Sequence, residues 1–206
     1  MSLTLRYMQL PDIPQVVTID NLAFDPPWSA RSYSYEVSES NYSHMVVLEQ
    51  EDAARPVNGW RRIVQNLSGA REPEKHILGY GGLWHIMDEA HISTIATHPD
   101  FRGRGLGEVL LAGMIRRALT LKADYLVLEV RVSNTTAQNL YTKYDFKTVG
   151  VKRRYYHNNG EDAYEMHLYF EAPDFRAAFE ARFAALAAKH QLTDAYTDCK
   201  PPRQQR

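Results

Sequence analysis

A glycine- and arginine-rich turn between an apolar strand and an amphipathic helix constrains this chain more than any other feature. The sequence IATHPDFRGRGLGEVLLAGMIRRAL spans residues 95–119, and its turn holds three glycines and two arginines. A helix start presents unpaired N–H groups and partial positive charge, glycines let a ligand approach that backbone, and arginine satisfies phosphate oxygens. The pattern predicts a site for a phosphate-bearing ligand, although a turn of this kind can also merely begin a helix.

The spacing of this turn distinguishes it from two common phosphate-binding motifs. A P-loop needs a lysine followed by serine or threonine, and the turn contains no lysine. The dinucleotide fingerprint G-x-G-x-x-G, started at Gly103, would need a glycine where Glu108 stands, and the connection from the strand is too long for it. The pattern that remains is R-x-x-G-x-G, formed by Arg102, Gly105 and Gly107.

Strand and helix patterns along the chain predict one mixed α/β domain. Strands are expected near residues 3–9, 44–50, 75–88, 89–99, 124–131, 146–156 and 163–170, and helices near 11–24, after Ser29, and near 105–122, 134–144 and 175–190. Residues 51–74 are polar and lack a sustained period, so we interpret them as an insertion whose ends lie close together. We expect a main domain over 1–170 and a C-terminal helical extension over 171–206, with the last dozen residues frayed.

Composition excludes several classes of protein. The 24 basic and 25 acidic residues nearly cancel, so no global field favours nucleic acid or anionic lipid. The single Cys199 excludes a disulfide framework and a cysteine metal cluster. The amino terminus lacks the pattern of a signal peptide, and no apolar run approaches the ~18 residues of a membrane span. We therefore expect a soluble, cytoplasmic protein with no direct nucleic-acid or membrane partner.

Four blocks of the sequence resemble one family. They are PPWS at 26–29, EAHISTIATHPDFRGRGLG, LEVRVSNTTAQNLY and YYHNNGEDAYEM, in an order and at spacings that match the GCN5-related N-acetyltransferase (GNAT) family. The resemblance covers about residues 3–170 apart from the insertion, and it is strongest to the bacterial ribosomal-protein-alanine and archaeal N-terminal acetyltransferases. It implies an α/β (α+β) fold with a central mixed, mostly antiparallel, splayed sheet flanked by helices.

The resemblance implies acetyl-CoA as co-substrate and a set of residues that hold it. The pantetheine arm would bond to exposed backbone of the strand before the turn, and the pyrophosphate would rest on the turn with an arginine at the rim. An asparagine at the next helix start would reach the acetyl end, and it can also serve as a plain N-cap. The cofactor-binding residues implied are Ile95, Ala96, Thr97, Arg102, Gly103, Arg104, Gly105, Leu106, Gly107, Glu108 and Asn134.

The same resemblance assigns catalytic and acceptor-binding residues. Glu129 matches the proton acceptor and Tyr141 the proton donor. From the residues alone, Glu129 could instead form an ion pair with Arg131, and Tyr141 could be core packing. His91 could take part in amine deprotonation through a water. Because the histidines near this strand match no ligand spacing with a carboxylate, we expect no metal site. The peptide slot would be lined by Pro27, Trp28, Tyr155 and Tyr156.

The pKa values of the two common amine classes in proteins bear on which amine is the acceptor. An α-amino group has a pKa of ~7.7 to 8.0 and a lysine side chain ~10.4, so the neutral fractions at pH 7 differ by about 3.5 kcal/mol. One carboxylate is an adequate base for the former, which favours a protein N-terminus as acceptor. Two alternatives stay open: an acetyltransferase for a small amine such as a polyamine or an amino sugar, and a non-catalytic acyl-CoA-binding regulatory domain.

The sequence departs from the family pattern in three places. Asp145 stands where the family has glycine, at a turn that favours a positive φ, and this could shift Tyr141. The 51–74 insertion and the helix after residue 173 are additions. The basic run Lys152, Arg153 and Arg154 is interpreted as a solvated face. The oligomeric state, monomer or dimer, stays open.

Overall fold

The computed structural model describes residues 2–51 and 75–201, so the predicted insertion lies almost entirely outside the described residues. The strands are β1 (Leu3–Tyr7), β2 (Ser43–Glu51), β3 (Lys75–Ile86), β4 (Glu89–Thr97), β5 (Tyr125–Arg131), β6 (Lys147–Tyr156), β7 (Glu161–Tyr169) and β8 (Leu192–Ala195). The helices are α1 (Ile13–Ala23), α2 (Ala30–Ser38), α4 (Leu106–Thr120), α5 (Thr135–Lys143) and α6 (Phe175–His190), with short 3-10 turns η1 (Leu10–Asp12) and η2 (Pro99–Phe101). Within this part of the chain no helix is long and apolar enough to cross a membrane.

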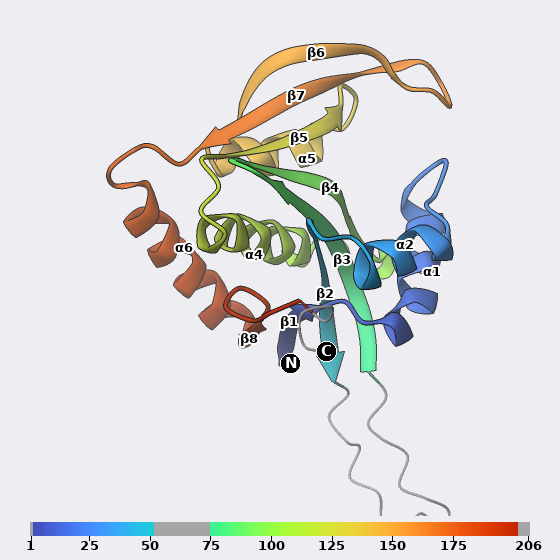
Figure 1. Cartoon of the computed structure of the whole chain (residues 1–206), viewed down its shortest axis with the longest axis horizontal. Helices are drawn as coiled ribbons and strands as arrows, with labels where there is room; N and C mark the ends of the chain where they lie inside the picture. The colour runs from blue at the N-terminus through green and yellow to red at the C-terminus, as the bar shows by residue number, and fades with distance from the viewer. Residues whose placement is uncertain (1, 52–74, 202–206) are drawn as a thin grey trace, which may run out of the picture.

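One eight-stranded sheet organises the described residues, in the order β6-β7-β5-β4-β3-β2-β1-β8 (Figure 1). Only β1–β8 and β4–β5 are parallel pairs, and all the others are antiparallel. Helices α4 and α6 cover one face, and α1 and α2 cover part of the other (Figure 1). The predicted mixed, mostly antiparallel sheet flanked by helices is confirmed.

The sheet opens between β4 and β5. These strands pair only from Glu89 opposite Tyr125 to Ile92 opposite Leu128. The next residue, Ser93, is an extra residue in β4, because Leu83 of β3 pairs with Ile92 while Gly82 pairs with Thr94. A bulge of this kind bends its strand. Beyond the bulge β4 continues along β3 and β5 continues along β7, so the two strands part and leave a gap in the middle of the sheet.

Helix α4 is held against the sheet by an apolar face and a close backbone approach. Eleven of its residues are buried, which agrees with the predicted three-and-four spacing. A Cβ at Gly113 would lie 2.3 Å from Cδ2 of Leu5, so glycine leaves room for the end of this β1 side chain against the backbone of α4. Helix α4 makes most of its contacts with β3 and β4, next to the place where β4 and β5 part.

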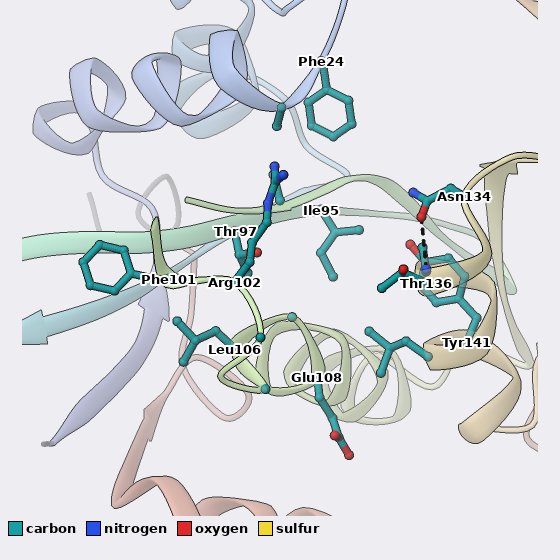
Figure 2. Close-up of a pocket in the computed structure, with 17 residues that line it drawn as sticks. Phe24, Ile95, Thr97, Phe101, Arg102, Leu106, Glu108, Asn134, Thr136 and Tyr141 are labelled. Carbon is teal, nitrogen blue, oxygen red and sulfur yellow. Dashed lines mark hydrogen bonds between the residues drawn. The ribbon is translucent and has the colours of Figure 1, made fainter. Parts of the chain in front are cut away.

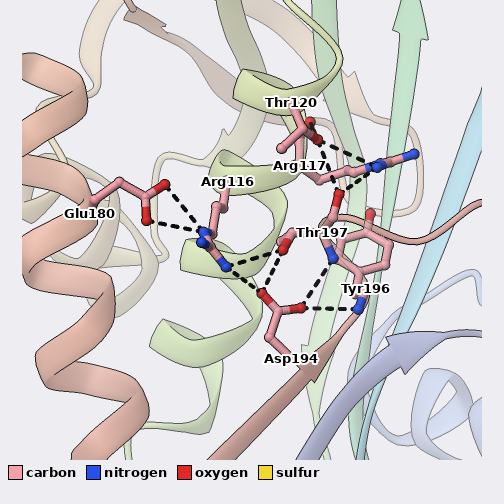
Figure 3. A network of polar contacts seen from close by, with 7 residues as sticks. All are labelled: Arg116, Arg117, Thr120, Glu180, Asp194, Tyr196 and Thr197. Carbon is pink, nitrogen blue, oxygen red and sulfur yellow. Dashed lines mark hydrogen bonds and ion pairs between the residues drawn. The ribbon is translucent and has the colours of Figure 1, made fainter.

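The C-terminal extension is part of the same core, and the prediction that the last dozen residues fray is wrong for those that the structure describes. Strand β8 pairs with β1, and Tyr196 is completely buried with its hydroxyl donating to the carbonyl of His44. Arg116 of α4 contacts Glu180 of α6 and Asp194 of β8 (Figure 3). These ion pairs could not be predicted, because contacts between residues so far apart in the chain leave no local pattern in a sequence.

Candidate active site

Two connected cavities lie where β4 and β5 part. The larger, of about 600 Å³, faces the first turn of α4, and the smaller, of about 350 Å³, faces β5 and the ends of β6 and α1. They share a wall of six residues: Ala23, Phe24, Ile95, Asn134, Ala137 and Tyr141. Figure 2 shows the larger cavity between β4, α4 and α5. The two cavities therefore form one cleft with two ends.

The turn before α4 forms the anion-binding end of the cleft. Gly103 and Gly105 have φ of 76° and 80°, a left-handed conformation that glycine adopts without strain. The amides of Leu106 and Gly107 come before the first hydrogen bond of α4, which begins with the Glu108 and Val109 amides donating to the Gly105 carbonyl. A Cβ on Gly107 would meet nothing closer than 3.9 Å, so this backbone borders open space. The exposed amides, the helix start and the absence of side chains over them fit a pyrophosphate.

The side chains of this turn are not equivalent. Arg102 reaches from the turn across the cleft toward α1 (Figure 2). Arg104 does not line the cleft, and its guanidinium lies 5.0 Å from the centre of the Phe101 ring. Glu108 points away from the cleft toward Lys143, at 2.6 Å (Figure 2). Of the predicted residues in the turn, only Arg102 brings a charged side chain into the cleft.

The end of β4 forms a ledge along the cleft. Ile95, Ala96 and Thr97 all line the larger cavity. Their backbone pairs with β3 on one side, while β5 has turned away on the other. Peptide groups on that open side have no strand partner among the described residues, so they are available to an extended ligand such as a pantetheine arm.

Helix α5 brings two predicted residues to the junction of the cavities. Asn134 caps the helix, its side chain accepting from the Ala137 amide at 3.1 Å, and it also lines both cavities. Tyr141 is 6% exposed, and burial, with a smaller effect of Tyr156, raises its pKa. Asp145 adopts φ of 67°, as glycine would, so the turn after α5 keeps its form and Tyr141 stays in the cleft.

Glu129 lies in the smaller cavity within a polar cluster. Its Oε2 is 2.8 Å from Nε2 of His91, and its Oε1 accepts from the ammonium of Lys152. Burial by itself would raise the pKa of Glu129, but the contacts with His91 and Lys152 outweigh it and lower the pKa to about 2. Arg131, the ion-pair partner considered from sequence, instead contacts Glu161 at 2.8 Å. Glu129 is therefore an ionised carboxylate at neutral pH.

Aromatic side chains wall the smaller cavity. Trp28, Tyr155 and Tyr156 line it, whereas Pro27 is exposed and its neighbour Pro26 lines the cavity. The two tyrosine rings meet edge to face at 5.2 Å. The position of Trp28 is fixed by a hydrogen bond from its backbone N–H to the carboxylate of the buried Asp20, at 2.5 Å.

Sequence reasoning missed several residues of the cleft. Lys152 was interpreted as part of a solvated face, yet it contacts both Glu129 and Glu165. Its position in the middle of β6, on the face it shares with Glu129, could have been found only once the pairing of β6, β7 and β5 was known. Asp20 and Phe24 belong to α1 and the residue after it, where the sequence carries no motif. Among the described residues, no three His, Cys, Asp or Glu side chains gather as metal ligands would.

Comparison with known proteins places these features in one family. Residues 13–146 match the Acetyltransferase (GNAT) family. A Bacillus subtilis protein provisionally named a ribosomal protein bS18-alanine N-acetyltransferase is 36% identical over 158 residues, covering 77% of this chain and 89% of that protein. An N-alpha-acetyltransferase of Sulfurisphaera tokodaii is 31% identical over 163 residues, covering 79% and 90%.

A solved structure agrees with these sequence matches. The ribosomal-protein-S18-alanine N-acetyltransferase of Escherichia coli superposes with a TM-score of 0.62 at 27% identity, covering 81% of this chain and 93% of that one. The splayed sheet, the glycine turn at the start of α4 and the sequence matches lead to one conclusion: this chain belongs to the GNAT family of acetyltransferases, whose members use acetyl-CoA.

Proposed function

We propose that this protein acetylates the N-terminal α-amino group of a protein. One observation carries the proposal: a single cleft joins an anion-binding turn at one end to an ionised carboxylate and aromatic walls at the other. The names of the two relatives, an alanine N-acetyltransferase and an N-alpha-acetyltransferase, support the same acceptor class. We place the activity in the cytoplasm, where protein N-termini emerge during synthesis.

The larger cavity would hold acetyl-CoA. The amides from Gly103 to Gly107 and the guanidinium of Arg102 would bind the pyrophosphate, and the open edge of Ile95 to Thr97 would bind the pantetheine arm. Bound acetyl-CoA supplies the acetyl thioester, from which the acetyl group passes to the amine as the thiol leaves. Asn134 and Tyr141, on the wall shared by both cavities, would lie beside the reacting groups.

Proton removal from the amine calls for more than Glu129 alone. Moving a proton from an ammonium of pKa near 8 to a carboxylate of pKa about 2 costs ~8 kcal/mol. Imidazole gains and loses protons near neutral pH, and a carboxylate in contact with it stabilises the charged form. We therefore assign the acceptor role to the His91–Glu129 pair. His91 is 24% exposed, so the proton has a path to solvent.

Tyr141 would act on the leaving group, the thiolate of coenzyme A. Because its pKa is raised, the hydroxyl stays protonated at neutral pH. No hydrogen bond ties that hydroxyl to another described residue, and the side chain lines both cavities. The Oη proton is therefore available to a leaving thiolate, with the hydrogen bond strengthening as the transition state forms.

The test is acetyl transfer measured by mass spectrometry. An alanine-starting peptide and a panel of small amines, including a polyamine and an amino sugar, are incubated with the protein and labelled acetyl-CoA. We expect label on the peptide α-amine, with Glu129→Gln and Tyr141→Phe slowing transfer and the surface variant Tyr125→Phe matching the wild type. Rapid labelling of small amines with none on the peptide would contradict the proposal. Full activity of both site variants would contradict the assigned roles.

A further inference from the structure

A second hollow lies beside the acceptor end of the cleft. Its volume is about 510 Å³, and it runs along α2 and the outer face of β3. Trp28 and Trp84 stack at 6.3 Å with 22° between their planes, and the Trp84 Nε1 donates to the buried Glu36 at 3.0 Å. Because this hydrogen bond fixes the indole, the hollow has a rigid aromatic wall. We call it the aromatic groove, formed by Trp28, Trp84, Tyr35, Glu36 and Arg31.

The aromatic groove is continuous with the acceptor cavity. Trp28 lines both hollows. Trp84 meets His91 edge to face at 5.7 Å, and His91 in turn contacts Glu129. A chain whose first amine lies at Glu129 therefore has a continuous surface to follow, away from the anion-binding turn and past the tryptophans.

The groove has a distinct chemical character. Tyr35 is 46% exposed, so part of its ring is available to a ligand in the hollow. Arg31 is exposed at the same site and forms no ion pair within the described residues. Glu36 is already engaged by Trp84, so it does not neutralise that guanidinium in an ion pair. As far as the structure describes the chain, the groove offers aromatic faces together with the guanidinium of Arg31, which has no ion-pair partner there.

We propose that the aromatic groove binds the acceptor polypeptide beyond its first two residues, and that it prefers an aromatic side chain followed by an acidic one. This inference rests on the proposed function, since the acceptor must be a polypeptide. An aromatic side chain would pack on Trp28 and Trp84, and a carboxylate would pair with Arg31. A small amine has neither an aromatic nor an acidic side chain to place in the groove, so the groove would give the enzyme selectivity among polypeptides.

The test compares acceptor peptides that share the same first two residues. One is a dipeptide amide, one continues with glycine and serine only, and a third set carries Phe-Glu placed in turn from the third to the sixth position. We expect the best Phe-Glu peptide to have a KM roughly three- to tenfold lower than the glycine-serine peptide, as an aromatic contact provides. Tyr35→Ala and Trp84→Ala should each bring this ratio close to one. The best Phe-Glu peptide is also compared with the same peptide carrying lysine in place of the glutamate, and Arg31→Glu should remove the preference for glutamate that the wild type shows in this comparison.

The control is Tyr169→Ala. The exposed fraction of Tyr169, 49%, is similar to that of Tyr35, but Tyr169 lies on β7 and lines neither hollow. It should leave the ratio unchanged. Equal KM values for all long peptides, with acetylation intact, would contradict the proposed role of the aromatic groove and leave the proposed function standing. Absence of acetylation on every peptide would overturn both. A dimer that Tyr35→Ala converts to a monomer would identify the groove as a contact between two copies, and that too overturns the proposal.

Discussion

Replacing Lys152 with methionine should raise the pKa of Glu129 and weaken the dependence of stability on pH. Lys152 is one of two groups that hold this pKa at about 2 against the effect of burial, the other being His91. A carboxyl whose pKa is lowered on folding contributes stability above its unfolded pKa and loses it as pH falls through the folded value. For Glu129 that loss runs from about pH 5 down to pH 2.

The magnitude follows from the structure. The difference between the ordinary value of 4.5 and about 2 corresponds to ~3 kcal/mol for a carboxylate that is 7% exposed. We assign roughly half of this free energy to the contact with Lys152. Because the Lys152 side chain is 39% exposed, solvent screening reduces its contribution to about 1 kcal/mol. Lys152→Met should thus lower the free energy of unfolding at pH 7 by about 1 kcal/mol relative to wild type, and this difference should narrow below about pH 3 and close at about pH 2 and below, where Glu129 is protonated in both proteins.

The assay is urea denaturation of both proteins at a series of pH values from 7 down to about 2, which covers the folded pKa of Glu129. The matched control is Lys147→Met, a change of the same kind on the same strand, at an exposed lysine without an ion pair among the described residues. We expect the control to follow the wild-type curve. A Lys152→Met curve parallel to wild type over the whole range would refute the argument that Lys152 holds Glu129 ionised.

Four further outcomes are expected. Tyr141→Phe should lower kcat by on the order of a hundredfold or more at little change in the KM for acetyl-CoA, measured by steady-state kinetics, since it removes a proton and leaves the cleft wall in place. Gly105→Ala should weaken acetyl-CoA binding in calorimetry, because φ of 80° strains alanine by about 1 kcal/mol or more and its Cβ would lie 3.3 Å from His190. Asp20→Ala should raise the KM for the acceptor peptide while Asp20→Asn retains most of the wild-type value, because the asparagine oxygen can still accept from the Trp28 amide. Arg117→Ala should lower the free energy of unfolding by about 2 kcal/mol in denaturation, since the buried guanidinium donates to the carbonyl of Thr197.

The fold was predictable because its strongest signals are local. The apolar spacing of α4 and the glycine turn before it identify a helix, its face and its start, and the structure confirms all three. The ends of the insertion were expected to be close, and Glu51 pairs with Lys75. The prediction that the strand before the turn parts from its neighbour rested on the family resemblance, because a bulge at Ser93 has no signature in a single sequence.

The electrostatics of the cleft could not be predicted in the same way. Sequence identified Glu129 as a candidate, but the proton affinity of a carboxyl depends on groups that only the folded sheet brings together. His91 comes from β4 and Lys152 from β6, strands that lie on opposite sides of Glu129. A base chosen by motif alone would have been assigned an ordinary carboxyl pKa.

The parting of the strands also explains why one cleft can serve both substrates. If β4 and β5 stayed paired to their ends, Glu129 would face a continuous sheet and the open edge of Ile95 to Thr97 would be bonded to β5. Because β5 instead follows β7, its Glu129 side chain stays with the acceptor walls while the end of β4 runs to the anion-binding turn. Tyr141, on the helix that follows β5, then lies between the two ends. A change that restores pairing at Ser93 should therefore disable donor and acceptor binding together, whereas changes at either end should affect one substrate alone.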